Sequence, residues 1–347
     1  MERKIKVLVV DDAAFMRKAV TRILETDTGI EVVGAARNGL EALEEIRRMD
    51  PDVVTLDIDM PIMDGLTAMR HIMVESPRPV VALSSLFSDG AVTFDALRLG
   101  IVDFVPKPSG AVSTDIDTSG QQLIDRIKIA CSMNLTNVRR VRLRKNWAQA
   151  LRVDRLYAFQ PLEYMIVIGT TLTGPNTIIR LLSKLSPFLP AAIIVHQEIS
   201  PKIIDAFVAE FNRHVPWRVE AARDGMIIQQ GACCIGSTEH ALGLELSETG
   251  EVRLHSDMSV AAPLDALFSS ASEIFGRNTI GLLLTGIGSD GARGFARIKA
   301  HNGTTIVQDR QCCVFPNLTD NAIQKGVVDL IIDERQMPHT LESLMAT

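Results

Sequence analysis

Five short apolar segments alternate with helical patterns over the first 105 residues, and this alternation restricts the fold more than any other feature. The apolar segments are residues 5–10, 30–35, 52–56, 79–83 and 102–105. Strands that alternate with helices form a parallel sheet with helices on both faces. The sequence therefore predicts an α/β domain with a doubly wound, five-stranded sheet.

Polar residues stand at the ends of four of these segments: Asp11-Asp12, Asp57, Ser84 and Lys107. Because the carboxyl ends of parallel strands lie at one edge of a sheet, we expect these side chains to converge. Three carboxylates repel one another without a cation, and a hard divalent ion such as Mg²⁺ suits an all-oxygen site. With Mg²⁺ bound, Asp57 could attack a phosphoryl donor, and Lys107 and Ser84 could contact phosphoryl oxygens.

These residues follow a known pattern, Asp57-x-x-Met60-Pro61-x-Met63-Asp64-Gly65 with the paired Asp11-Asp12 and Lys107-Pro108. Residues 4–125 thus resemble the receiver domain of two-component response regulators, which has a CheY- or flavodoxin-like fold. The resemblance implies that a histidine kinase phosphorylates Asp57.

The same resemblance implies that Mg²⁺ is held by Asp12, Asp57 and the backbone carbonyl of Asp59, with Asp11 acting through water. It also places Phe104 at the position of the family's switch aromatic. A packed core phenylalanine is an equally good interpretation of Phe104.

Residues 126–160, after a receiver domain over residues 1–125, have a helical and basic pattern. Its basic residues are Arg139, Arg140, Arg142, Arg144, Lys145, Arg152 and Arg155. A basic helix can contact nucleic acid or a membrane surface, but we favour a solvated linker that pairs with acidic surfaces of the flanking domains.

Composition excludes several classes of protein. The formal net charge of -6 argues against a general nucleic-acid binder. No apolar run is long enough to span a membrane, and the charged start is not a signal peptide. The five cysteines lack zinc-site spacing and are typical of a reducing compartment. We therefore expect a cytoplasmic protein with no nucleic-acid partner and no membrane insertion.

Residues 161–347 predict a second doubly wound α/β domain. Buried strand patterns occupy residues 164–169, 191–195, 279–285 and 304–307. Thr171, His196 and Asp290 follow three of them. A hydroxyl, an imidazole and a carboxylate at one sheet edge are the parts of a nucleophile–base–orienter triad. A histidine or threonine at a strand end is nevertheless more often structural.

A dinucleotide site is an alternative for the same stretch. Gly286-Ile-Gly288-Ser-Asp-Gly291 fits G-x-G-x-x-G, follows a strand and opens a helix, and Asp309 ends the next strand. Asp290 would repel the pyrophosphate, however, and little chain remains after Asp309.

Residues 164–335 also resemble the catalytic domain of CheB-type protein-glutamate methylesterases. The shared stretches are Val167-Ile-Gly169, Val195-His196, Val219-Glu-Ala with Asp224-Gly225, His240, Leu284-Thr-Gly-Ile-Gly-Ser-Asp-Gly-Ala-Arg-Gly294, Val307-Gln-Asp309, Ala322-Ile and Gly326-Val-Val-Asp329. The resemblance implies hydrolysis of glutamyl methyl esters, and deamidation of glutamines, on chemoreceptors, with no cofactor in the hydrolase domain. His196 would be the general base and Asp290 its orienting carboxylate.

The turn at residues 169–174 departs from that family. Thr171 stands where the nucleophilic serine is expected, Thr170 replaces an alanine and Thr173 replaces a glycine. A threonine hydroxyl can act as a nucleophile, although its methyl group restricts χ1.

Two hypotheses remain open. In the first, phosphorylation of Asp57 moves the receiver away from a Thr171–His196–Asp290 cleft and so activates a methylesterase. In the second, the chain is a receptor-binding or phosphate-sink module with a catalytically impaired hydrolase domain.

Overall fold

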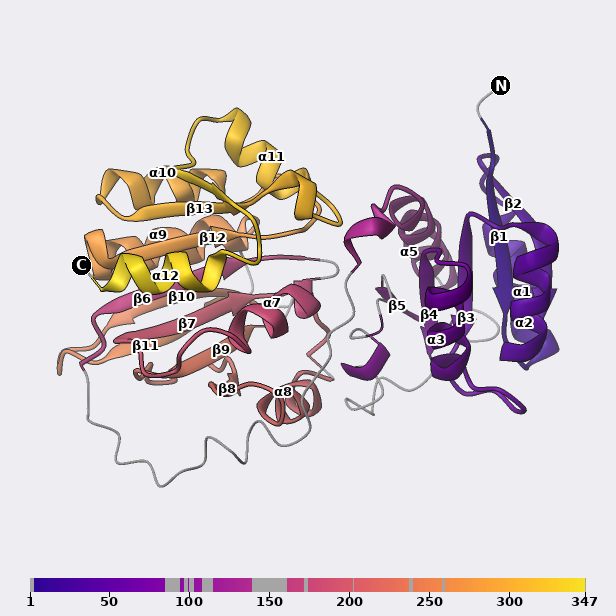
Figure 1. Cartoon of the computed structure of the whole chain (residues 1–347), viewed down its shortest axis with the longest axis horizontal. Helices are drawn as coiled ribbons and strands as arrows, with labels where there is room; N and C mark the ends of the chain where they lie inside the picture. Colours follow the sequence, from indigo (N-terminus) through magenta and orange to yellow (C-terminus); the bar gives the residue numbers. More distant parts are fainter. Residues whose placement is uncertain are drawn as a thin grey trace. The chain divides into compact units, whose positions relative to one another are not determined.

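The computed structural model describes residues 3–84, 94–96, 99, 103–107, 115–138, 161–171, 174–201, 203–236, 240–257 and 260–346. The chain divides into two compact units, Met1–Arg140 and Val141–Thr347, and each is considered by itself (Figure 1).

The first unit contains a five-stranded parallel sheet, as the alternation predicts. Its strands, in the order β2-β1-β3-β4-β5, are β1 (Ile5–Val10), β2 (Ile30–Ala36), β3 (Val53–Asp57), β4 (Val80–Ser84) and β5 (Asp103–Pro106). Strand β3 lies between β1 and β4, which places the end of β3 at the centre of the sheet edge.

The described helices of this unit are α1 (Ala14–Leu24), α2 (Gly39–Met49), α3 (Gly65–Glu75) and α5 (Asp115–Cys131). Helix α1 packs with α5, and α2 packs with α3. The side chains of Asn38 and Asp64 accept backbone hydrogen bonds at the starts of α2 and α3, which satisfies donors that a helix leaves unpaired. The basic residues of the predicted connector, from Arg139 onward, lie outside the described residues.

The second unit contains a seven-stranded parallel sheet in the order β14-β13-β12-β6-β7-β9-β8. Its strands are β6 (Tyr164–Gly169), β7 (Ala191–His196), β8 (Arg218–Ala221), β9 (Ala232–Gly236), β12 (Thr279–Leu283), β13 (Thr304–Gln308) and β14 (Leu330–Ile332). Met165 to Ile168 are all fully buried, and since side chains alternate between the faces of a strand, both faces of this sheet are covered.

The helices of this unit are α7 (Gly174–Leu182), α8 (Ile204–Asn212), α9 (Pro263–Phe275), α10 (Ala292–Ala300), α11 (Asn317–Gln324) and α12 (Met337–Met345). Helix α9 packs against α10, and α7 packs against α12. Strands β10 (Ala241–Leu246) and β11 (Val252–Asp257) form an antiparallel hairpin that the sequence patterns did not predict. No helix in the described part of the chain has the length and apolarity needed to cross a membrane.

Candidate functional site

An acidic pocket lies where β1 and β3 end in the first unit. Asp11, Asp12 and Asp57 each place a carboxylate oxygen within 4.8 Å of the others, and Asp11 and Asp57 are buried. The Nζ atom of Lys107, just after β5, lies 2.6 Å from Asp57 Oδ2 and 2.9 Å from Asp11 Oδ2. The topology thus brings these four predicted residues together.

Charge in this pocket is only partly compensated. Burial raises the pKa of Asp57, although its hydrogen bond from Lys107 acts in the opposite direction. The pKa of Lys107 is raised because its hydrogen bonds to Asp11 and Asp57 outweigh its desolvation. One ammonium cannot balance three carboxylates, and the oxygen-only donor set fits Mg²⁺.

Backbone geometry explains the residues that follow Asp57. A Cβ atom on Gly65 would lie 2.1 Å from the carbonyl oxygen of Asp57, so only glycine fits there. The Asp59 N–H donates to Asp57 Oδ1 at 3.3 Å, and the Asp59 side chain is exposed. The Asp59 carboxylate is not part of the acidic cluster, so Asp59 could contribute to a metal site through its backbone.

A further positioning contact was not predicted. One guanidinium nitrogen of Arg17 donates to the carbonyl oxygens of Asp11 and Asp12, at 2.7 and 2.9 Å. Arg17 lies on α1, and its position five residues after Asp12 was the only feature of the sequence that could have indicated this contact.

Phe104 is partly buried and packs against the core. The side chain of Ser84 lies outside the described residues, although its backbone ends β4.

The second candidate site lies at the corresponding sheet edge of the second unit. Strands β12, β6 and β7 are neighbours, with Leu283 paired to Gly169 and Gly169 paired to His196. Thr171 follows β6, His196 ends β7, and Asp290 lies in the turn between β12 and α10. The backbone thus brings the three predicted segments to one edge of the sheet.

The Thr171 hydroxyl is held by backbone. Its Oγ1 accepts a hydrogen bond from the Ile287 N–H at 2.7 Å, and the Gln197 amide donates to the Thr171 carbonyl at 2.8 Å. The adjacent Thr170 is fully buried and donates its hydroxyl to the Thr285 carbonyl at 2.7 Å. The second hydroxyl of this turn therefore anchors it to the segment that follows β12.

Asp290 caps a helix. Its carboxylate accepts from the N–H groups of Leu264, Asp265 and Gly291 at 2.7, 3.1 and 2.7 Å. Burial raises the pKa of Asp290, and these backbone hydrogen bonds oppose that shift. In return, the Asp265 carboxylate accepts from the Gly294 N–H in the first turn of α10, so the two helices cap each other.

His196 is buried, and its burial lowers the pKa of the imidazole to about 4. The imidazole is therefore neutral at pH 7. Its Nδ1 atom has no hydrogen-bond partner, and no hydrogen bond joins it to Thr171 or Asp290 within the described residues. The structure brings the triad segments together but does not pair the three side chains.

Three backbone N–H groups of the glycine-rich turn already have acceptors within the protein. They are the N–H groups at Gly286, Ile287 and Gly291, which donate to Phe315, Thr171 and Asp290. Phosphate-binding turns present such groups to the ligand. These contacts argue against the dinucleotide interpretation.

Fold and pocket together define a response regulator: a receiver domain followed by a second α/β domain. The profile of the response regulator receiver domain matches residues 7–114, and that of the CheB methylesterase family matches residues 166–341.

Three curated relatives carry the name protein-glutamate methylesterase/protein-glutamine glutaminase. The one from Pyrococcus horikoshii is 33% identical, with 98% of this chain and 94% of the relative covered. Those from Halalkalibacterium halodurans and Thermotoga maritima are 36% and 33% identical, with 95% and 99% of both chains covered. The chain belongs to the CheB methylesterase family, a family of hydrolases, and it carries that family's receiver domain.

Proposed function

We propose that a histidine kinase phosphorylates this chain on Asp57 with the help of Mg²⁺, and that phosphorylation controls demethylation of glutamyl side chains on chemoreceptors. The observation that carries this proposal is the collinear match of both domains to relatives named for that hydrolysis, over 98% of the chain.

The receiver pocket supports the first half of the proposal. Mg²⁺ would be held by Asp12, Asp57 and the Asp59 carbonyl, with Asp11 acting through water, and its positive charge would oppose the rise that burial causes in the pKa of Asp57. Lys107 already lies 2.6 Å from the carboxylate that would carry the phosphoryl group. Its ammonium would move with little cost from that oxygen to a phosphoryl oxygen.

In the second domain, Thr171 is the proposed nucleophile, His196 the base and Asp290 the orienting carboxylate. The Thr171 hydroxyl would attack the ester carbonyl while its proton passes to the imidazole, which is neutral and can accept it. The ester carbon–oxygen bond would then break, and the imidazolium would return its proton to the departing methoxide, so that methanol leaves. Water would hydrolyse the resulting acyl-threonine ester and release the glutamate. The Ile287 N–H, now bonded to Thr171 Oγ1, could stabilise the oxyanion once the hydroxyl turns away.

Methanol release from methylated chemoreceptor membranes tests this proposal. The wild type should release methanol, and more rapidly with a small phosphoryl donor and Mg²⁺ than without them. Thr171→Ala and His196→Ala should each abolish release and still accept the phosphoryl group. Undiminished release by Thr171→Ala would contradict the assigned nucleophile.

One observation favours a second candidate, a receptor-binding or phosphate-sink module with an impaired hydrolase. The Asp290 carboxylate accepts three backbone N–H groups, and the His196 imidazole has no hydrogen bond to Asp290 or Thr171. This candidate predicts phosphorylation and receptor binding without methanol release in any condition. It also predicts that Thr171→Ser, which restores the family's nucleophile, does not create activity.

A further inference from the structure

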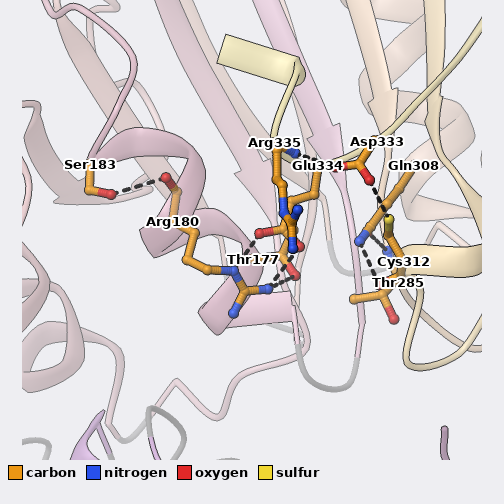
Figure 2. A network of polar contacts seen from close by, with 9 residues as sticks. All are labelled: Thr177, Arg180, Ser183, Thr285, Gln308, Cys312, Asp333, Glu334 and Arg335. Carbon is orange, nitrogen blue, oxygen red and sulfur yellow. Dashed lines mark hydrogen bonds and ion pairs between the residues drawn. The ribbon is translucent and has the colours of Figure 1, made fainter. Parts of the chain in front are cut away.

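A chain of polar contacts, buried near Thr285 and part-buried near α12, connects both ends of the Thr171 turn to the segment that precedes α12. On one side of the turn, the Thr170 hydroxyl donates to the Thr285 carbonyl. On the other side, α7 begins at Gly174 and carries Thr177 and Arg180. Figure 2 shows the contacts that lie between these two ends.

From Thr285 the chain of contacts passes through Gln308. The Thr285 N–H donates to Gln308 Oε1 at 2.8 Å, and Gln308 Nε2 donates to the Cys312 carbonyl at 3.1 Å. Thr285 and Gln308 are almost completely buried. Because each amide atom of Gln308 has a partner, the side chain has one orientation that satisfies both.

Cys312 contacts the segment that precedes α12. Its Sγ lies 3.1 Å from Asp333 Oδ2, and the other Asp333 oxygen accepts from the Arg335 N–H at 2.8 Å. Glu334 lies between these two residues. The backbone of this segment is thereby fixed on both sides of Glu334 (Figure 2).

An ion pair between Arg180 and Glu334 closes a ring of contacts. The ring runs from Thr170 through Thr285, Gln308, Cys312, Asp333 and Glu334 to Arg180 on α7. Arg180 donates to Glu334 through Nε to Oε1 and through Nη2 to Oε2, the latter at 2.9 Å, and Nη2 also donates to Thr177 Oγ1 at 3.1 Å. The side chains of Arg180 and Glu334 are 17% and 6% exposed. A bidentate pair of this kind fixes the orientation of the guanidinium relative to the carboxylate as well as their distance. A lysine ammonium could not fix that orientation.

We infer that Arg180 and Glu334 are positioning residues that hold α7, and with it the Thr171 turn, in the geometry needed for attack on the substrate. The inference rests on the proposed function of Thr171. Neither residue touches the Thr171 hydroxyl, and both act through the ring that joins α7 to Thr170. A shift of about 1 Å at a reacting atom can lower a rate on the order of a hundredfold.

Glu334→Gln tests the ring, with Glu273→Gln as the matched control. Glu273 pairs with Arg297 between α9 and α10 of the same domain, but both side chains are more than half exposed. Glu334→Gln should lower kcat for methanol release by about 10- to 100-fold with little change in KM, and Glu273→Gln should change neither. Arg180→Lys should resemble Glu334→Gln, since it retains the charge but loses the bidentate geometry.

A double variant separates positioning from simple stability. Arg180→Met/Glu334→Leu removes both charges, and such exchanges of a buried pair for apolar residues often preserve stability. If the pair positions the turn, the double variant should recover the wild-type Tm while kcat remains at least about tenfold low. Recovery of kcat together with Tm would reduce the pair to a structural role and overturn the inference.

Amide hydrogen exchange gives a readout that does not depend on hydrolysis. Glu334→Gln should speed exchange at Thr170, Thr171 and the first turn of α7 by about tenfold or more, whereas Glu273→Gln should not. If the wild type releases no methanol but Glu334→Gln speeds amide exchange in the turn, the structural role of the ring is supported and the hydrolase proposal is contradicted. Unchanged exchange and an unchanged kcat would overturn the ring.

Discussion

Both sheets of this protein gather polar residues at the carboxyl ends of their parallel strands, but within the described residues these side chains form ion pairs or hydrogen bonds with one another only in the receiver. In the receiver, Lys107 Nζ contacts Asp57 and Asp11 directly, and the carboxylates gather within 4.8 Å. In the second domain, Thr171, His196 and Asp290 stand at the ends of three neighbouring strands, but backbone N–H groups hold Thr171 and Asp290. A parallel sheet therefore brings strand ends together, and the turns decide whether their side chains meet.

The difference has an electrostatic reason. Opposite charges in the receiver pocket attract across a buried edge, so the ammonium and the carboxylates contact each other. The second edge holds a neutral imidazole, a hydroxyl and one carboxylate. Two N–H donors at the amino terminus of α9, together with the Gly291 N–H, compete for that carboxylate. For phosphorylation, the receiver site needs only Mg²⁺ and a phosphoryl donor. For hydrolysis, the side chains of Thr171 and Asp290 at the second edge must first exchange their present hydrogen-bond partners.

The largest effect should come from Asp57→Asn, because an amide cannot form an acyl phosphate. We expect complete loss of phosphoryl incorporation from a small phosphoryl donor, measured by phosphoprotein mass spectrometry with Mg²⁺. Asp59→Asn is the matched control, since the Asp59 side chain is exposed and only its backbone is expected at the metal. Incorporation in Asp57→Asn at the wild-type level would show that another residue accepts the phosphoryl group.

The buried His196 should make stability depend on pH. Its pKa is about 4 in the folded protein and 6.5 ordinarily, so only the unfolded chain binds this proton between those values. The contribution is therefore present above about pH 6.5 and is lost as the pH falls toward 4, a change of about 3 kcal/mol.

Chemical unfolding of the second domain at pH 7.5 and pH 4.5 measures this change. His196→Gln should lose less stability than the wild type between the two pH values. An equal loss in both proteins would mean that His196 is charged or solvated in the fold, and the contrast between a neutral second edge and a charged first edge would fail.

Asp290→Asn tests whether helix capping is a real role of this residue. The variant loses the negative charge at the amino terminus of α9, so the free energy of unfolding should fall by about 1–2 kcal/mol. Asp205→Asn, at a carboxylate that is 69% exposed, should change it by less than about 0.5 kcal/mol. Lost hydrolysis without lost stability would instead place Asp290 on His196 during the reaction.

The smallest effect should come from Thr171→Ser. Serine lacks the methyl group that restricts χ1, so its hydroxyl can leave the Ile287 N–H and turn toward His196 more readily. Methanol release should rise about tenfold, which corresponds to about 1.4 kcal/mol. A decrease would show that the turn is shaped for threonine.

The ring of contacts that joins α7 to Thr170 also shows what local patterns could not reveal. Arg180 and Glu334 lie 154 residues apart, and nothing in either local sequence distinguishes them from solvated charges. The same holds for Asp265 and Asp290, which cap each other's helices across the turn. The hairpin β10–β11, by contrast, had a local signal that was overlooked: Leu242, Leu244 and Leu246 alternate with other residues, as do Val252 and Leu254 after the turn.

The sequence by itself determined the two α/β domains, the convergence of Asp11, Asp12, Asp57 and Lys107, and the common sheet edge of Thr171, His196 and Asp290. These follow from strand periodicity, which is local, and from the general rule that parallel strands of one sheet end at one edge. Only the tertiary structure decided which hydrogen bonds the Thr171 hydroxyl and the Asp290 carboxylate make, and how far burial depresses the pKa of His196. Those outcomes depend on donors and apolar atoms contributed by segments distant in the chain, which no local pattern contains.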